Sequence, residues 1–260
     1  MHRRCLLTST PLPQLTRGML LPILDKTLLL DPDHELDFSR ALVLPEPPLP
    51  GSDILPIEGL CTLMPQVYRE LLKIQPPVGF GILIPLILKW MEGDYPALGE
   101  PISHVKLAPA RQAVGRILTC LREKDISRLP HATRSLVGLG EGLTPSGDDF
   151  LGGMYFALFL WGKTHPGLMD DLMCTSSEFI HQCRHLTNDI SFTMLLDHIH
   201  GHALYPLHAF AHDLLEGRPV NILLPHARGL IAVGHSTGWD LLTGFLGGMS
   251  AACALLLGKG

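Results

Sequence analysis

The chain has 260 residues, a formal net charge of −5 at pH 7, and 46% hydrophobic against 17% charged residues. Its lysines and arginines are scattered, so nothing in the charge pattern favours a nucleic acid or an anionic membrane as partner. The six cysteines are widely spaced and form no Cys-x-x-Cys pair. This spacing is typical of reduced thiols and predicts a cytoplasmic protein. The high apolar content favours an oligomer.

The first fifty residues alternate short apolar runs with turn residues, which predicts β-strands joined by tight turns. The runs lie at residues 19–26, 27–33 and 36–44. A proline-rich segment at 44–51 then marks a boundary, because proline cannot enter a helix interior. We therefore predict an α+β protein, with a small N-terminal β domain (residues 1–50) followed by a larger helix-dominated domain (residues 51–260).

Apolar residues at helical spacing dominate the rest of the chain. Helices are predicted at residues 60–73, 80–91, 109–123, 146–162, 168–185, 190–200, 204–215 and 237–257. Pro85 marks a kink or a start in the second of them. The last one approaches the length that crosses a membrane, but its glycines and hydroxyl residues favour a buried helix.

The segment Gly138–Gly153 combines glycines, hydroxyl residues and paired carboxylates directly ahead of a predicted helix. Ser146 is predicted to be the N-cap of that helix, with Asp149 as its acidic capping-box partner. Such a cap occurs at many helices that bind nothing, but it needs no second carboxylate at Asp148. The segment therefore predicts a ligand site. Its candidate residues are Gly140, Gly142, Thr144, Ser146, Gly147, Asp148 and Asp149.

A second segment, Gly234–Gly248, repeats this pattern 91 residues further along the chain. Its candidate residues are His235, Ser236, Thr237, Gly238 and Asp240. Two helix starts of one design suggest a shared site, in which free N–H groups and the positive ends of two helix dipoles face an anion. The alternative is that two glycine-faced helices pack closely and have similar starts for that reason alone.

Nine of the fourteen histidines lie between residues 181 and 235. The pairs His181/His185 and His208/His212 have the i, i+4 spacing of ligands on one helix face. No His-Glu-x-x-His motif occurs, however, and polar helix faces also account for the histidines. We assign no metal site from this pattern.

The first motif, Gly138–Leu151, resembles the hallmark loop of the AllH-like family, which is encoded beside allantoin-degradation genes and associated with oxamate carbamoyltransferase. Gly234–Gly244 is similar to the C-terminal motif of that family, and Leu36–Ala41 to the end of its β region. The resemblance implies a carbamoyltransferase subunit in purine catabolism that acts on carbamoyl phosphate and on oxamate or oxalurate. It does not imply that this chain holds the whole active site.

Both substrates are anions, and the candidate residues suit them. Asp148 or Asp149 is expected to orient an amide N–H of oxamate or to hold a magnesium ion, and His235 to carry a proton or contact phosphate. No other cofactor is implied. Because two carboxylates repel an anion, a cation is also needed. Arg134, Arg228 or a partner subunit is expected to supply it, in a homo-oligomer or in a complex with other carbamoyltransferase subunits.

Two alternatives remain open. The run Ser146–Gly153 also resembles the signature of ribokinase-like sugar kinases, in which a glycine-rich helix start forms an anion hole and an aspartate serves as base. The chain lacks the alternating strand–helix plan of those kinases. The other alternative is a non-catalytic binding or assembly subunit with a vestigial pocket.

Overall fold

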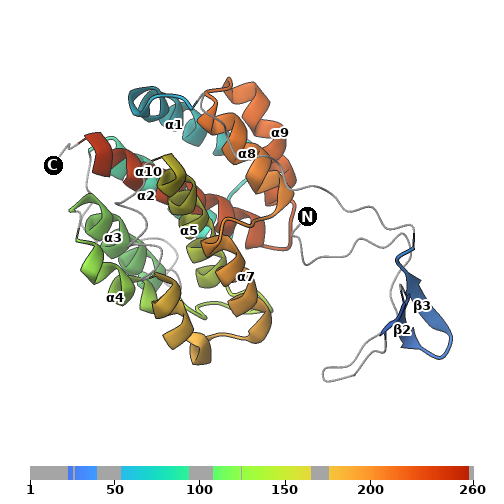
Figure 1. Cartoon of the computed structure of the whole chain (residues 1–260). Coiled ribbons are helices and arrows are strands. Elements are labelled where there is room, and N and C mark those ends of the chain that lie inside the picture. Colours follow the sequence, from blue (N-terminus) through green and yellow to red (C-terminus); the bar gives the residue numbers. More distant parts are fainter. Residues whose placement is uncertain are drawn as a thin grey trace. The chain divides into compact units, whose positions relative to one another are not determined.

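The computed structural model describes residues 23–25, 27–39, 54–93, 108–123, 125–164 and 176–257. The described residues fall into two compact units, one within residues 3–46 and one that begins at Pro47 (Figure 1). Strands form the first unit and helices form the second. The predicted α+β class, with a small β part followed by a helix-dominated part, is confirmed.

The small unit is an antiparallel sheet of three strands in the order β1 (Ile23–Leu24), β2 (Thr27–Asp31) and β3 (His34–Asp37). Asp31 fixes the turn between β2 and β3, because its carboxylate accepts from the Asp33 N–H at 2.9 Å and pairs with His34 Nδ1 at 2.8 Å. Strands β1 and β2 lie within the first two predicted apolar runs, whereas β3 begins at His34, before the third run at residues 36–44, and shares only residues 36–37 with it. The end of the third run, residues 40–44, lies outside the described residues.

The described helices of the larger unit are α1 (Ile57–Leu71), the 3₁₀ helix η1 (Gly79–Leu83), α2 (Ile84–Met91), α3 (Ala108–Arg122), η3 (Ile126–Arg128), α4 (Leu129–Arg134), α5 (Ser146–Thr164), η4 (Arg184–Leu186), α7 (Asp189–Ile199), α8 (Tyr205–Leu215), α9 (Val220–Ile231) and α10 (Thr237–Leu257). Residues 176–182 are also helical, within the predicted span 168–185. Two helices escaped prediction. The first, α4, has only six residues, and α9 contains Pro225, which a sequence pattern treats as a break.

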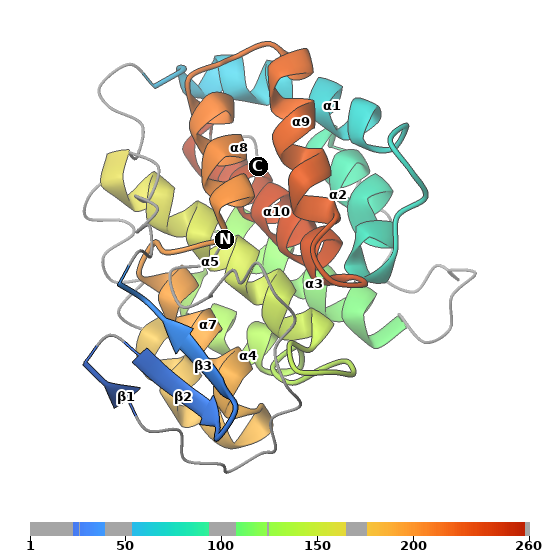
Figure 2. The same cartoon turned by 90° about the vertical axis from the view of Figure 1, so that its right-hand side faces the viewer.

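Two helices, α5 and α10, lie side by side at the centre of the larger unit (Figures 1 and 2). Figures 1 and 2 also show α8 and α9 on one side of this pair and α4 and α7 on the opposite side. Residues 238–253 of α10 are buried along their whole length, as predicted for this apolar stretch. In the described part of the chain, no helix combines the length and apolar character that crossing a membrane requires.

The crossing of α5 and α10 depends on glycine at equivalent positions of the two motifs. A Cβ atom on Gly153 would overlap the Leu241 carbonyl of α10. A Cβ atom on Gly244, 91 residues later, would overlap the Phe150 carbonyl of α5, and Phe150 is 91 residues before Leu241. The contact is therefore reciprocal, and it brings the two helix backbones as close as glycine permits.

Candidate functional site

The two motifs fold into the same kind of turn before their helices. The Gly147 N–H donates to the Leu139 carbonyl at 2.8 Å, and the Gly238 N–H donates to the Val233 carbonyl at 3.1 Å. Each of these glycines also lies so close to a preceding carbonyl that a Cβ atom would overlap it. The repeated sequence pattern thus corresponds to a repeated local structure.

The helix caps differ from the sequence prediction. The Asp148 and Asp149 N–H groups both donate to the Pro145 carbonyl, at 2.9 and 3.1 Å, and Ser146 is the first helical residue. Pro145 is therefore the N-cap of α5, and the prediction of Ser146 as N-cap was wrong. In α10 the Asp240 N–H donates to the Ser236 carbonyl at 2.9 Å, so Ser236 holds the N-cap position.

Hydroxyl groups of the first motif contact hydroxyl groups of the second motif at the two helix starts. Ser146 Oγ lies 3.3 Å from Ser236 Oγ, and Thr144 Oγ1 lies 3.1 Å from Thr237 Oγ1. The expectation that the two motifs meet is therefore confirmed. These four hydroxyls surround the carboxyl groups of Asp149 and Asp240, one from each motif.

Asp149 and Asp240, called the aspartate pair below, are both buried, with exposed fractions of 5% and 0%. Burial raises the pKa of Asp149 to about 8, and the negative charge of Asp240 adds to the rise. Hydrogen bonding by the Thr237 and Thr144 hydroxyls opposes it. Burial also raises the pKa of Asp240, to about 6. At pH 7 the pair therefore holds one proton, mainly on Asp149, and one negative charge, mainly on Asp240.

The η1 segment completes the surroundings of Asp240. The Phe80 N–H donates to Asp240 Oδ1 at 2.6 Å, which together with the Ser146 and Ser236 hydroxyls moderates the rise of the Asp240 pKa. A Cβ atom on Gly79 would overlap the same oxygen, and Gly79 has a φ of +54°. Sequence reasoning missed this segment. Its only signal was the pair of glycines at 79 and 81 that follows two prolines.

Each member of the pair keeps one oxygen without a partner. Oδ2 of Asp149 and Oδ2 of Asp240 are buried and have no hydrogen-bond partner among the described residues. A buried, unpartnered carboxyl oxygen costs free energy, because it has lost its water without gaining a donor or an acceptor. These two oxygens are therefore the atoms of the site that could still form a hydrogen bond with a ligand.

Asp148 serves a different purpose from Asp149. Its carboxylate accepts from the Gly138 N–H at 2.7 Å, from the Ser191 hydroxyl at 2.7 Å and from the Thr187 hydroxyl. These bonds tie the glycine loop to the start of α7, and they occupy both carboxylate oxygens. The geometry gives Asp148 a structural task, so the chemistry predicted for either aspartate is best placed on Asp149.

The remaining predicted residues lie around the pair or away from it. Gly140 and Gly142 are exposed in the loop, where their φ angles are +126° and +94°. His235 is exposed in the turn before α10. Arg134 is exposed at the end of α4, where its Nη1 donates to Cys183 Sγ at 3.7 Å. The structure does not bring the Arg134 guanidinium to the aspartate pair in any contact that it describes.

We expected backbone N–H groups of the two helix starts to bind an anion, but few of these N–H groups are free to donate. The N–H groups of residues 147, 148, 149, 238 and 240 already donate to carbonyl groups of their own turns. The dipoles of α5 and α10 still direct positive potential at the pair. That potential favours the negative charge that the pair already carries, rather than an added anion.

The candidate carboxylates also do not gather as metal ligands. Among the described residues, the one group of three or more side chains with metal-ligand geometry is His212, Asp213 and Glu216 of α8 and its end. A magnesium ion at Asp148 would have to displace three hydrogen-bond donors. The aspartate pair is better suited to proton transfer, since two neighbouring acids with different pKa values provide a donor and an acceptor at one pH.

No solved structure matches the chain. The family model described as oxamate carbamoyltransferase subunit AllH matches residues 136–249, a segment that contains both motifs, both central helices and the aspartate pair. Residues 136–249 of this chain are therefore similar to the AllH family, as the two motifs led us to expect.

Proposed function

We propose that the chain is a subunit of a carbamoyltransferase and that its aspartate pair binds the carbamoyl acceptor, oxamate. The observation that carries this proposal is the pair itself, a protonated Asp149 beside an ionised Asp240, each with one unpartnered oxygen. The description of the matching family supports the choice of reaction. The amide of oxamate has an N–H that needs an acceptor and an oxygen that needs a donor, and the pair offers one of each. The carboxylate of oxamate is repelled by the ionised Asp240, so a cation from a partner subunit has to face it.

The proton transfers follow from the two pKa values. The oxamate nitrogen attacks the carbamoyl carbon of carbamoyl phosphate, a C–N bond forms, and the C–O bond to phosphate breaks. Asp240, ionised at pH 7, accepts the proton that leaves the nitrogen, and this proton later passes to the departing phosphate. Asp149 keeps its proton and donates a hydrogen bond to the oxygen on which negative charge develops.

The phosphate part of the reaction is assigned to a partner subunit. The groups that the described residues place against the pair are hydroxyls and a backbone N–H, and none of them is cationic. A phosphate dianion needs positive side chains for binding and for charge stabilisation at the transition state. A chain that binds the acceptor, and whose partner subunit binds the phosphate, would act as one subunit of a larger enzyme.

Access to the buried pair requires movement of the glycine loop. Residues 140–143 are exposed, and Thr144 at the end of the loop lies against Thr237 beside the pair. One exposed hydrogen bond, from Asn188 Nδ2 to the Leu143 carbonyl at 2.9 Å, holds the loop from outside. We assign the entry of oxamate to the opening of this loop.

Calorimetric titration with oxamate, of the full chain assembled with its partner subunits, tests the acceptor site. We expect saturable binding at pH 7 that weakens at least tenfold in Asp149→Ala and in Asp240→Ala. Asp149→Asn should retain binding, because a carboxamide is a donor at every pH. It should also abolish the loss of affinity that the wild type shows as pH rises through about 8.

The matched control is Asp189→Asn, which changes an aspartate in the first turn of α7 whose side chain is 78% exposed. It should bind oxamate like the wild type. Equal oxamate affinity in the wild type and in both folded alanine variants would refute the acceptor site.

A second candidate function is that of an assembly subunit without chemistry of its own. The nearly complete burial of the pair and the glycine contact of α5 with α10 favour it, because both also describe a packing device. In that case no ligand should bind the aspartate pair. Partner chains should then be retained by folded Asp149→Ala and Asp240→Ala to the same extent as by the wild type.

A further inference from the structure

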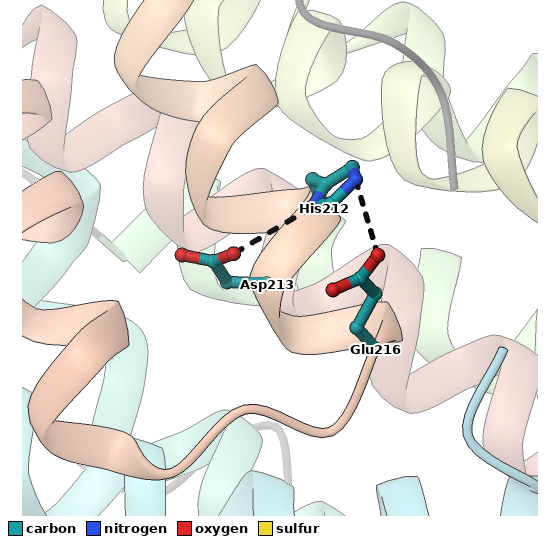
Figure 3. Close-up of side chains that lie close together, drawn as sticks. All are labelled: His212, Asp213 and Glu216. Atoms are coloured by element: carbon teal, nitrogen blue, oxygen red, sulfur yellow. Dashed lines mark ion pairs between the residues drawn. The ribbon is translucent and has the colours of Figure 1, made fainter. Parts of the chain in front are cut away.

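A second cluster of polar side chains lies at the end of α8, on residues that the proposed function does not use. His212 stands between the carboxylates of Asp213 and Glu216 (Figure 3). His212 Nδ1 lies 3.5 Å from Asp213 Oδ1, and His212 Nε2 lies 3.3 Å from Glu216 Oε1. Their side chains are 26%, 17% and 24% exposed. The cluster therefore sits in a partly sheltered place that water still reaches.

The distances in the cluster suit a metal ion. One nitrogen of His212 and one oxygen from each carboxylate lie within 4.8 Å of one another. Zinc bonds to such ligands are about 2.0–2.2 Å long, so neighbouring ligand atoms of a tetrahedral site are about 3.4 Å apart. The ligand atoms have to approach one another by up to about 1.4 Å to reach that geometry. The His212 ring also has to turn, because Asp213 and Glu216 lie at different nitrogens of the ring.

Neighbouring residues hold both carboxylates from outside. Arg218 donates to Glu216 Oε2 from Nε at 3.0 Å and from Nη2 at 2.9 Å. His226 of α9 places its Nε2 at 3.2 Å from Asp213 Oδ2. In each carboxylate the outer oxygen is therefore occupied, and the other oxygen is left facing His212. Outer contacts of this kind orient ligands and strengthen metal binding.

The electrostatics of the place also favour a cation. Asp213 and Glu216 supply two negative charges, and Arg218 offsets one of them from outside. The cluster lies in the last turn of α8, which ends at Leu215, so the negative end of the helix dipole adds to the attraction. The two carboxylates therefore leave a net negative charge beside His212.

We propose that His212, Asp213 and Glu216 bind a divalent transition-metal ion, with zinc as the preferred ion. One imidazole nitrogen and two carboxylate oxygens form a donor set that zinc accepts, and the imidazole favours zinc over magnesium or calcium. Three protein ligands leave the remaining positions to water. Asp213, as a ligand of the ion, also contacts His226 of α9. The bound ion therefore stabilises the contact between the end of α8 and α9 across the turn at Gly217.

Zinc titration of the metal-free full chain tests this site. The protein must carry no histidine tag, because a tag would bind zinc itself and add to any background binding by the fourteen histidines of the chain. Competition against a chromophoric chelator gives the stoichiometry and the affinity, and thermal unfolding with and without ZnCl2 gives an independent readout. We expect one ion per chain and a raised melting temperature.

Variants separate ligands from their supports. His212→Ala and Glu216→Gln should each weaken zinc binding by more than 100-fold, and His226→Ala should weaken it by about 10–100-fold. His185→Ala changes an exposed histidine outside the cluster and should bind zinc like the wild type. Glu216→Gln keeps the side-chain shape, so its loss of zinc binding cannot be ascribed to unfolding if its circular dichroism is unchanged.

Two results would overturn the site. One is zinc uptake that is equal in the wild type, His212→Ala and Glu216→Gln, which would assign the binding to other histidines. The other is absence of saturable zinc uptake in the wild type, which would make the cluster a set of histidine–carboxylate ion pairs only. Saturable binding of MnCl2 without binding of ZnCl2 would overturn the preference for zinc.

Discussion

Replacing Asp149 with asparagine should remove a large part of the pH dependence of folding stability. The pKa of Asp149 rises from 3.8 to about 8 in the folded protein. Between these values the folded state holds a proton that the unfolded state has released, so the free energy of unfolding falls as pH rises. The stability gained from the proton is fully present below about pH 4 and is lost by about pH 8.

The size of the effect follows from the slope of the linkage. One proton bound only by the folded state changes the free energy of unfolding by about 1.4 kcal/mol per pH unit. Asp149 alone should therefore lower the stability of the wild type by about 3 kcal/mol between pH 5 and pH 7. Asp240, with a pKa of about 6, adds to the slope only below pH 6. Above that pH, Asp149 is the member of the aspartate pair that sets the slope.

Urea unfolding at pH 5, 6, 7 and 8 measures this difference. Asparagine does not ionise, so Asp149→Asn should match the wild type below about pH 4, and its advantage in stability should grow by about 3 kcal/mol between pH 5 and pH 7. Subtracting the two curves removes the contribution of the histidines. Asp189→Asn, which changes an exposed aspartate, should keep the wild-type slope. Parallel curves for the wild type and Asp149→Asn would refute the assignment of a proton to Asp149.

Two further predictions concern packing and the glycine loop. Gly244→Ala should destabilise the protein by about 1–3 kcal/mol, because the added Cβ overlaps the Phe150 carbonyl, whereas Gly247→Ala on the same helix meets nothing closer than 3.6 Å and should stabilise by up to about 1 kcal/mol. Thermal unfolding checks both, and equal effects of the two variants would contradict the close crossing. Asp148→Ala should cost about 3 kcal/mol, since one buried and two partly buried donors lose their acceptor, and Asp148→Asn should cost less. A loss of oxamate binding without a loss of stability in Asp148→Ala would show that this residue acts on the ligand.

Local patterns were sufficient to predict most helices and the two similar helix starts. The glycine, hydroxyl and acidic residues before α5 and α10 predicted both helix starts, because a helix start depends on neighbours in sequence. The repeat of the pattern suggested that the two helix starts lie next to each other. The hydroxyl contacts between the two motifs were not predictable. Ser146 and Thr237 contact residues of the other motif only after the chain has folded. The same holds for the Phe80 N–H, which comes from a segment with little sequence signal.

The helix crossing and the aspartate pair are separate properties of this sequence. Close packing of α5 on α10 needs small residues such as Gly153 and Gly244, and apolar or amide residues at 149 and 240 would satisfy it without burying a charge. Burial raises the pKa of both Asp149 and Asp240, so the pair lowers the stability of the fold near neutral pH. The predicted gain in stability of Asp149→Asn at pH 7 is the size of that cost. If, in the assembled enzyme, Asp149→Ala no longer supports carbamoyl transfer and Asp149→Asn still does, the hydrogen-bond donor at position 149 is retained for chemistry rather than for folding.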